Sequence, residues 1–497
     1  MPQSVIPTSC IESTICAPGL TVPDLSEVLA TCPSTGHVVA PAGFGKTHLI
    51  AEAVSRSVNR QLVLTHTYAG VNVLRRKMRE LRVGEKCFRV DTIASWALRL
   101  SLSYPLTSGW AIVRPAGYQW SDLYRACSLL LDSGFIRRIL RASYGGLYVD
   151  EYQDCSAEQH KLVLKLARDL PCRLLGDPLQ GIFDFNEQSV DWDKDISAML
   201  NPLGRLETPH RWNRAGAQAI GHWLGVVREQ LEHKQPVDLT QGLPHGVTFT
   251  QVNDPANLSR IQANACRYFR CEPDESVIAI HKGSEKSRCH ALARNLGGKF
   301  SSIEEIEGKA LFSFVERVQR ARSNKKKLKE VCEFASQCMT SVKESLSAGT
   351  LRGEHVQVRG DTRNPFVARA ANACLADLTS DTVAGFLSAL KAIGQVRIIR
   401  ADLFNRMMGI LRKQALHPHL SLGEAAEKYH SEFRYRGRPL SRRNLIGTTL
   451  LVKGLEFDHA VVLDAGSLSR KELYVAITRG AKSLTIISSS SVLTPAD

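Results

Sequence analysis

Residues 37–58 contain a short apolar run, a glycine-rich turn and an amphipathic segment, in that order. HVVA (37–40) predicts a buried strand, and THLIAEAVSRSV (47–58) predicts a helix. In the turn between them, backbone N–H groups and the helix N-terminus can face one point, which suits a bound polyphosphate. We therefore predict a phosphate-binding loop that consists of Ala40, Pro41, Ala42, Gly43, Phe44, Gly45, Lys46 and Thr47.

Two side chains at the end of this loop have separate predicted roles. The Lys46 ammonium would neutralise the outer phosphate oxygens of a nucleoside triphosphate, and the Thr47 hydroxyl would be a ligand of Mg²⁺. The usual pattern G-x-x-x-x-G-K-[ST] begins with glycine, whereas Ala40 stands at that place here. The prediction therefore depends on the strand and helix that flank the loop, more than on the tripeptide GKT.

A second signature is LYVDEYQDC (147–155), in which an apolar run ends in adjacent carboxylates. We predict that Asp150 holds Mg²⁺ through water and that Glu151 orients or deprotonates an attacking water molecule. A cation beside them would offset the repulsion between two like charges. The alternative is an ordinary helix N-terminus, where the helix dipole favours acidic residues.

Short apolar runs separated by helical stretches recur along the chain. HVVA is followed by QLVLTHT (61–67), LYVDE (147–151), CRLLGD (172–177), SVIAIH (276–281), TTLLV (448–452), HAVVLDA (459–465) and SLTIISS (483–489). This alternation predicts an α/β protein with parallel, doubly wound sheets. The expected parts are an irregular segment at 1–35, a first domain at 36–202 with a short insertion near 101–146, a second domain at 203–300 and 446–497, and a mostly helical, basic insertion at 301–445.

Charge is distributed unevenly over the 497 residues. The formal net charge is +15, and residues 309–443 hold 25 Lys and Arg against 12 Asp and Glu. An excess concentrated in one region favours a polyanionic partner such as a nucleic acid. Any single basic cluster could instead be a solvated helix surface.

Composition argues against several other classes of protein. None of the 13 cysteines stands in a C-x-x-C pair, so a zinc or iron–sulfur site is not expected. No apolar run is long enough to span a bilayer, and the N-terminus lacks the basic start and apolar block of a signal peptide. We expect a cytoplasmic protein.

Further along the chain, the motifs resemble those of superfamily 1 DNA helicases of the UvrD/Rep/PcrA type. DEYQD (150–154) resembles the DExQD signature, GDPLQGIFDF (176–185) motif III, LETPHRW (206–212) motif IV, TTLLVKGLEFD (448–458) motif V and LYVAITRG (473–480) motif VI. The resemblance implies two tandem RecA-like P-loop domains that bind ATP and Mg²⁺ between them. It also implies that Gln180 senses the γ-phosphate, that Arg211 and Arg479 contact it, and that Glu456 binds the ribose.

The same resemblance implies a track for single-stranded DNA. VLTHTYAGVNVLRRKM (63–78) and DTIASWALRL (91–100) are similar to motifs Ia and Ib, and SVIAIHKGSEKSR (276–288) is similar to the motif that follows motif IV. Aromatic side chains in such a track stack on bases, although Trp96, Phe185 and His66 could also be structural residues. The implied DNA-binding residues are His66, Thr67, Thr92, Trp96, Phe183, Phe185, Arg288 and Thr448.

Departures from the family pattern bear on function. No glutamine lies between Gln3 and the loop, so the adenine-reading Q motif is absent or displaced. Leu450 and Leu451 replace a His-Ser pair in motif V, and Asn186 replaces an arginine after motif III. The leucines remove two polar contacts to the DNA backbone, which weakens the expected coupling to DNA.

Two functional hypotheses follow. The first is ATP-driven translocation on single-stranded DNA, with 3′–5′ unwinding of tailed duplexes. The second is a DNA- or nucleotide-sensing ATPase that regulates a partner protein, such as a nuclease, without productive unwinding; the compact helicase-like subunits of Gabija-type anti-phage systems resemble this layout. A small-molecule kinase of the P-loop class would leave the paired arginines and the basic insertion without a role.

Overall fold

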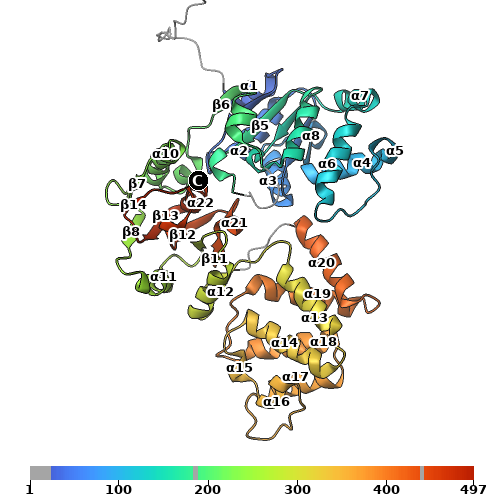
Figure 1. The fold of residues 1–497 in the computed structure, drawn as a ribbon, viewed down its shortest axis with the longest axis vertical. Coiled ribbons are helices and arrows are strands. Elements are labelled where there is room, and N and C mark those ends of the chain that lie inside the picture. The colour runs from blue at the N-terminus through green and yellow to red at the C-terminus, as the bar shows by residue number, and fades with distance from the viewer. Residues whose placement is uncertain (1–23, 183–188, 437–441, 497) are drawn as a thin grey trace, which may run out of the picture.

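The computed structural model describes residues 24–182, 189–436 and 442–496 (Figure 1). These residues form two α/β units, each built on a parallel sheet, and a separate group of helices. The predicted fold class is confirmed, since both sheets have the parallel pairing that the alternation of strands and helices indicates.

The first sheet has six parallel strands in the order β3-β2-β4-β5-β1-β6. The strands are β1 (Gly36–Val39), β2 (Gln61–Thr65), β3 (Phe88–Thr92), β4 (Gly146–Val149), β5 (Cys172–Gly176) and β6 (Asn201–Arg205). The central strands β1, β4 and β5 are adjacent in space and run in one direction, so the segments that follow them meet at one edge of the sheet.

The helices of this unit flank the strands of the sheet and also form the short insertion. They are α1 (Leu25–Thr31), α2 (Lys46–Arg56), α3 (Tyr68–Glu80), α4 (Ile93–Ser103), α5 (Pro105–Ser108), α6 (Gln119–Leu130), α7 (Gly134–Ser143) and α8 (Ala157–Ala167). Shorter turns are η1 (Glu85–Cys87), η2 (Tyr152–Asp154), η3 (Pro178–Gln180) and the π-helical turn η4 (Trp192–Ser197).

Helix α1 corrects the expectation that residues 1–35 are irregular. The Asp24 side chain accepts the Ser26 N–H and so caps the helix, and Leu29 is fully buried in the core of the first unit. The tyrosine hydroxyl of Tyr148 donates to the Leu29 carbonyl at 2.9 Å. These contacts hold the helix against β4, which the composition of the segment alone did not indicate.

The second sheet also has six parallel strands, in the order β10-β11-β9-β12-β13-β8. The strands are β8 (Val247–Gln251), β9 (Val277–His281), β10 (Ser301–Ser302), β11 (Asn444–Thr448), β12 (Phe457–Val462) and β13 (Gly480–Ser488), and a small antiparallel pair is formed by β7 (Val237–Asp238) and β14 (Val492–Leu493). The helices and turns are α9 (His210–Arg214), α10 (Gln218–Glu232), η5 (Pro255–Asn257), α11 (Leu258–Arg267), α12 (Lys286–Asn295), α21 (Thr449–Val452), η6 (Ala465–Ser467) and α22 (Arg470–Ile477).

One predicted strand of this sheet is wrong in its bounds. The run TTLLV (448–452) was expected to be a strand, but the strand β11 ends at Thr448 and the next four residues form α21. The apolar side chain of Val452 is buried in the core of the second unit from this short helix. An apolar run of this length is compatible with either element, and packing decides between them.

The chain between β10 and β11 leaves the second sheet and forms a helical group (Figure 1). Its helices are α13 (Lys309–Arg320), α14 (Asn324–Cys338), α15 (Val342–Ser345), α16 (Ala348–Arg352), α17 (Pro365–Ala376), α18 (Ser380–Ala392), α19 (Ala401–Leu416) and α20 (Leu422–Arg436). They share one apolar core that includes Leu328, Phe334, Phe386 and Met407. Helix α20 also contacts α3 of the first unit, so the helical group reaches both sheets.

Candidate active site

The phosphate loop has the backbone that a tight strand-to-helix turn requires. Gly43 and Gly45 have φ values of +77° and +91°, and Gly45 directly precedes the first turn of α2. A Cβ on Gly43 would lie 2.8 Å from a ring carbon of Trp212, and a Cβ on Gly45 would lie 3.0 Å from the imidazole of His210. The loop of the first unit therefore packs directly against helix α9 of the second.

The Lys46 side chain lies in a niche of carboxylates. Its Nζ is 2.7 Å from Glu151 Oε2 and 3.5 Å from Asp150 Oδ1, and the side chain is only 9% exposed. Burial disfavours the Lys46 charge, but the attraction of Glu151 and Asp150 is larger in sum and raises the pKa of Lys46. Lys46 is thus a fixed positive charge at the end of β1 and β4.

The two adjacent acids have different environments. Burial raises the pKa of Asp150 to about 6 in spite of the nearby Lys46 charge. Burial also acts on Glu151, but Lys46 and Lys453 outweigh it and lower the pKa of Glu151 to about 2. Glu151 is therefore the carboxylate that stays ionised, as a group that accepts a proton from water must be before reaction.

Glu151 is also held in an unusual backbone conformation. Its φ is +54°, a left-handed value that costs a residue with a Cβ about 1 kcal/mol or more. The Gln153 amide donates to Glu151 Oε2 at 2.7 Å, and the Glu151 N–H donates to Asp150 Oδ1 at 3.0 Å. Local hydrogen bonds thus hold the carboxylate toward Lys46.

The oxygen donors at this edge fit a hard divalent cation. Asp150 and Glu151 both face Lys46, so two negative charges meet one positive charge, and Thr47 follows Lys46 in the first turn of α2. Within the described ranges, no group of three or more His, Cys, Asp and Glu could hold a metal ion. This combination suits Mg²⁺, which takes one or two protein ligands together with phosphate oxygens and water.

Gln180 connects the loop to the arginines of the second unit. Its amide donates to Asp177 Oδ2 at 2.7 Å, and its Oε1 accepts from Arg479 Nη2 at 3.3 Å. Asp177 Oδ2 also accepts the Ala42 N–H of the phosphate loop at 3.0 Å. A side chain predicted to sense phosphate therefore lies between the loop and Arg479.

The two predicted arginines come together with Glu456. Arg211 Nη2 lies 2.6 Å from Glu456 Oε1, Arg211 Nη1 donates to the Thr478 carbonyl at 2.5 Å, and the Arg211 N–H donates to the Gly43 carbonyl at 2.9 Å. Burial, followed by the proximity of Arg211, lowers the pKa of Arg479 to about 10, so Arg479 keeps its charge at neutral pH. The structure thus gathers Lys46, Glu151, Gln180, Arg211, Arg479 and Glu456 around one loop.

The predicted DNA-binding residues are placed less uniformly. Trp96 is 4% exposed in the core of the first unit, and Thr92 caps α4 with its side chain on the Ser95 N–H. Thr448 is fully buried. All three side chains are buried in this structure, so none presents an exposed surface to a nucleic-acid strand.

The remaining members of that set lie nearer the surface or outside the described ranges. Thr67 is exposed and caps α3 through the Gly70 N–H at 3.1 Å, and Arg288 is 54% exposed beside Glu285. His66 Nε2 lies 3.6 Å from Cys155 Sγ, and burial lowers its pKa to about 4. Phe183 and Phe185 lie outside the residues that the structure describes.

Sequence reasoning missed three buried polar side chains at the junction of the units. Lys453 forms an ion pair with Asp154, Arg228 contacts Asp177 and the Tyr474 hydroxyl, and that hydroxyl also accepts the Ala42 N–H. The signal for Arg228 was available, since a lone charge stands among Leu224, Val227 and Leu231 on the buried face of α10. Tyr474 and Lys453 lie inside motifs VI and V, where only the arginine and the glutamate had been given roles.

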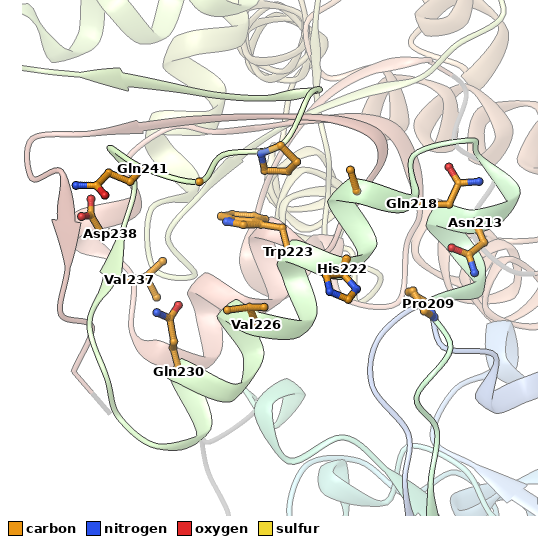
Figure 2. Close-up of a pocket in the computed structure, with 13 residues that line it drawn as sticks. Pro209, Asn213, Gln218, His222, Trp223, Val226, Gln230, Val237, Asp238 and Gln241 are labelled. Carbon is orange, nitrogen blue, oxygen red and sulfur yellow. The ribbon is translucent and has the colours of Figure 1, made fainter.

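One cavity of the described residues lies beside this site and not in it. Figure 2 shows Trp223, His222 and Val226 of α10 facing Val237 and Asp238, with Pro209 and Asn213 at one end. Its volume is about 970 Å³. The phosphate loop, Glu151 and the two arginines do not line this cavity.

Comparison with known proteins adds an independent finding. Residues 117–192 match the family model of the UvrD/REP helicase N-terminal domain. The resemblance to superfamily 1 helicases is confirmed by this match. The matched segment carries β4, Asp150, Glu151 and η3, but neither the phosphate loop nor the two arginines.

Among solved structures, the Pif1 helicase from Candida albicans is similar at 10% sequence identity and a TM-score of 0.39, with 94% of each chain covered. No curated protein matches the sequence. None of the described helices is long and apolar enough to cross a membrane.

Proposed function

We propose that this chain hydrolyses ATP between its two α/β units and uses the cycle to move 3′–5′ along single-stranded DNA and unwind tailed duplexes. The helicase family match supports the general class, an activity on nucleic acid. The hydrolysis, its Mg²⁺ dependence and the polarity are the parts that we add.

The observation that carries the proposal is the convergence of opposite domains on the loop. Lys46 comes from the first unit, and Arg211 and Arg479 come from the second. The Arg211 backbone N–H donates to the Gly43 carbonyl, while its guanidinium pairs with Glu456. Arg479 reaches the loop through Gln180 and Asp177. Positive groups on two sides of a loop that binds phosphate are the arrangement that stabilises charge on a transferred phosphoryl group.

Each residue of the site has a separate role in the proposed reaction. Lys46 and the loop N–H groups bind the phosphates, Asp150 and Thr47 hold Mg²⁺, and Mg²⁺ when bound neutralises phosphate charge. Glu151 accepts the proton of the attacking water. Arg211 and Arg479 stabilise the developing charge, a contribution on the order of 10³-fold in rate. The nucleotide must displace Glu151 from Lys46, so binding itself frees the base.

The alternative proposal is a DNA- or nucleotide-sensing ATPase that controls a partner protein such as a nuclease, in a setting like anti-phage defence. The observation that favours it is the state of motif V. Thr448 is fully buried, and Leu450 and Leu451 stand where polar side chains would grip DNA. A chain that binds nucleotide normally but holds DNA weakly would hydrolyse ATP and translocate inefficiently along DNA.

The test is ATPase activity with and without single-stranded DNA, together with displacement assays on 3′-tailed and 5′-tailed duplexes. We expect DNA-stimulated hydrolysis and displacement of the 3′-tailed substrate only. Hydrolysis without displacement of either duplex would favour the regulatory alternative. Displacement of the 5′-tailed substrate alone would reverse the polarity, and no Mg²⁺-dependent hydrolysis in either condition would refute both proposals.

A further inference from the structure

A buried ionic cluster joins the two units behind the phosphate loop. Arg228 of α10 is 2% exposed, and its Nη1 lies 2.7 Å from Asp177 Oδ1 and 2.7 Å from the Tyr474 hydroxyl. Its Nη2 lies 2.9 Å from Glu232 Oε1. Asp177 is fully buried, so Arg228 provides its counter-charge in a medium where an unpaired carboxylate is costly.

Asp177 links Arg228 to the phosphate loop and to η3 through hydrogen bonds. Its Oδ2 accepts the Ala42 N–H at 3.0 Å and the Gln180 amide at 2.7 Å, and its Oδ1 accepts the Leu179 N–H at 3.3 Å. The Tyr474 hydroxyl accepts the same Ala42 N–H at 3.3 Å. Every polar partner of this carboxylate is thus either part of the phosphate loop, part of η3 or a group from the second unit.

The surroundings make this geometry stiff. Ala42, Phe44 and Leu179 of the first unit share one apolar core with residues of α10 such as Leu224 and Val227. Close packing leaves few alternative positions for a side chain that sits among them. If Arg228 loses its charge, water cannot take its place beside the buried Asp177, so Asp177 and the loop groups bonded to it are expected to shift.

We propose that Arg228 is a positioning residue, which holds Asp177 so that Gln180 and the Ala42 N–H keep the geometry needed at the γ-phosphate. Tyr474 shares this role, since its hydroxyl bridges Arg228 and the loop. The kinetic consequence rests on the proposed ATP hydrolysis, whereas the structural consequence does not.

Amide hydrogen exchange of the nucleotide-free protein tests the structural part. The variants are Arg228→Met, which keeps length and removes charge, and Arg228→Lys, which restores charge. A control is Arg400→Met, because Arg400 also forms a buried ion pair, with Glu304 at 2.7 Å for both contacts, away from the loop. We expect Arg228→Met to raise exchange about tenfold or more in peptides covering 40–46 and 177–181, Arg228→Lys to restore part of the protection, and Arg400→Met to leave these peptides unchanged.

Two results would overturn the proposal. One is unchanged exchange of both peptides in Arg228→Met. The other is an increase spread evenly over the chain, or equal in Arg400→Met, because either would reduce Arg228 to a general stabiliser of the fold. The exchange measurements can be made whether or not the protein hydrolyses ATP.

Steady-state kinetics tests the catalytic part. We expect Arg228→Met and Tyr474→Phe to lower kcat about tenfold to a hundredfold with a KM change of less than about threefold, because misplacement of about 1 Å affects the reaction more than binding. Arg228→Lys should recover part of kcat. A rise in KM with kcat unchanged would contradict positioning, while an inactive wild-type protein with the expected exchange pattern would refute only the proposed function.

Discussion

At the scale of single residues, the site is organised as a competition for Lys46. In the nucleotide-free protein the ammonium is paired with Glu151 at 2.7 Å. Phosphate oxygens would compete for the same charge, and Glu151 would then lose the neighbour that most lowers its pKa. If Glu151 is the general base, as proposed, its pKa would rise when the nucleotide binds, and binding would activate it.

Glu151→Gln is expected to separate binding from turnover. An amide cannot accept the proton, so kcat should fall on the order of 10²- to 10⁴-fold. Nucleotide affinity should be equal or higher, since the amide competes less strongly for Lys46. Equilibrium binding and ATPase rates measure the two effects, with the exposed Glu316→Gln on α13 as a control for the loss of a charge. Turnover near that of the wild type would contradict the assigned role.

A buried imidazole should make stability depend on pH. Burial, with a smaller effect of Arg288, lowers the pKa of His281 to about 4, whereas an unfolded histidine titrates near 6.5. Between these values the unfolded chain binds more protons, so acidification destabilises the fold, by roughly 2 kcal/mol for this residue between pH 7 and pH 5. His281→Gln should lessen the pH dependence of unfolding by about that amount. The same substitution at the exposed His419 should not; equal effects in both would contradict the argument.

At the scale of elements, the residues that the phosphate loop can accept depend on its packing against Trp212 of α9 as well as on its own backbone. Gly43→Ala introduces a Cβ at a positive φ and 2.8 Å from the buried Trp212 ring, which is itself fixed by a 2.9 Å hydrogen bond to the Gly480 carbonyl. We expect a loss of about 2–4 kcal/mol in unfolding free energy and weaker nucleotide binding.

Gly109→Ala separates the two causes of that loss. Gly109 has a φ of +66°, but no atom lies within 4 Å of an added Cβ. Its substitution should cost only the backbone strain, about 1–2 kcal/mol, and leave nucleotide binding unchanged. Denaturant unfolding and nucleotide titration of both variants make the comparison. Equal effects would show that the contact with Trp212 is unimportant.

The elements also show where sequence reasoning ends. The loop and the acids after β4 were predictable because each is a local pattern of residue types with its own chemistry. Helix α1 was missed because its one strong signal, the cap at Asp24, stands in a segment rich in Pro, Ser and Thr. The contact of Arg228 with Asp177 joins residues 51 positions apart, and no local pattern carries such information. Trp96 was ambiguous, and packing alone placed it in the core.

At the scale of the whole molecule, two kinds of contact join the two α/β units beside the phosphate loop. The ion pair of Lys453 with Asp154 and the apolar packing of Phe44 on Trp212, at 6.3 Å between ring centroids, both cross between the units. If the proposed cycle separates the units, it must break both contacts, so part of its free energy would be used in opening.

The basic helical group is expected to bind the phosphates of single-stranded DNA. Lys326 and Lys329 of α14 are exposed, and the region around them carries most of the net positive charge. If they contact phosphates, the affinity for DNA falls with added salt, and the slope of log K against log[salt] decreases by about 0.7 for each contact removed. Lys326→Gln and Lys329→Gln together should therefore flatten the slope by about 1.4, as measured by fluorescence anisotropy at several salt concentrations. Lys161→Gln on α8, whose charge is paired with Glu158 at 3.0 Å, is the control and should leave the slope unchanged. A wild-type affinity that does not respond to salt would mean that this charge is a solvated surface, and that DNA is held elsewhere.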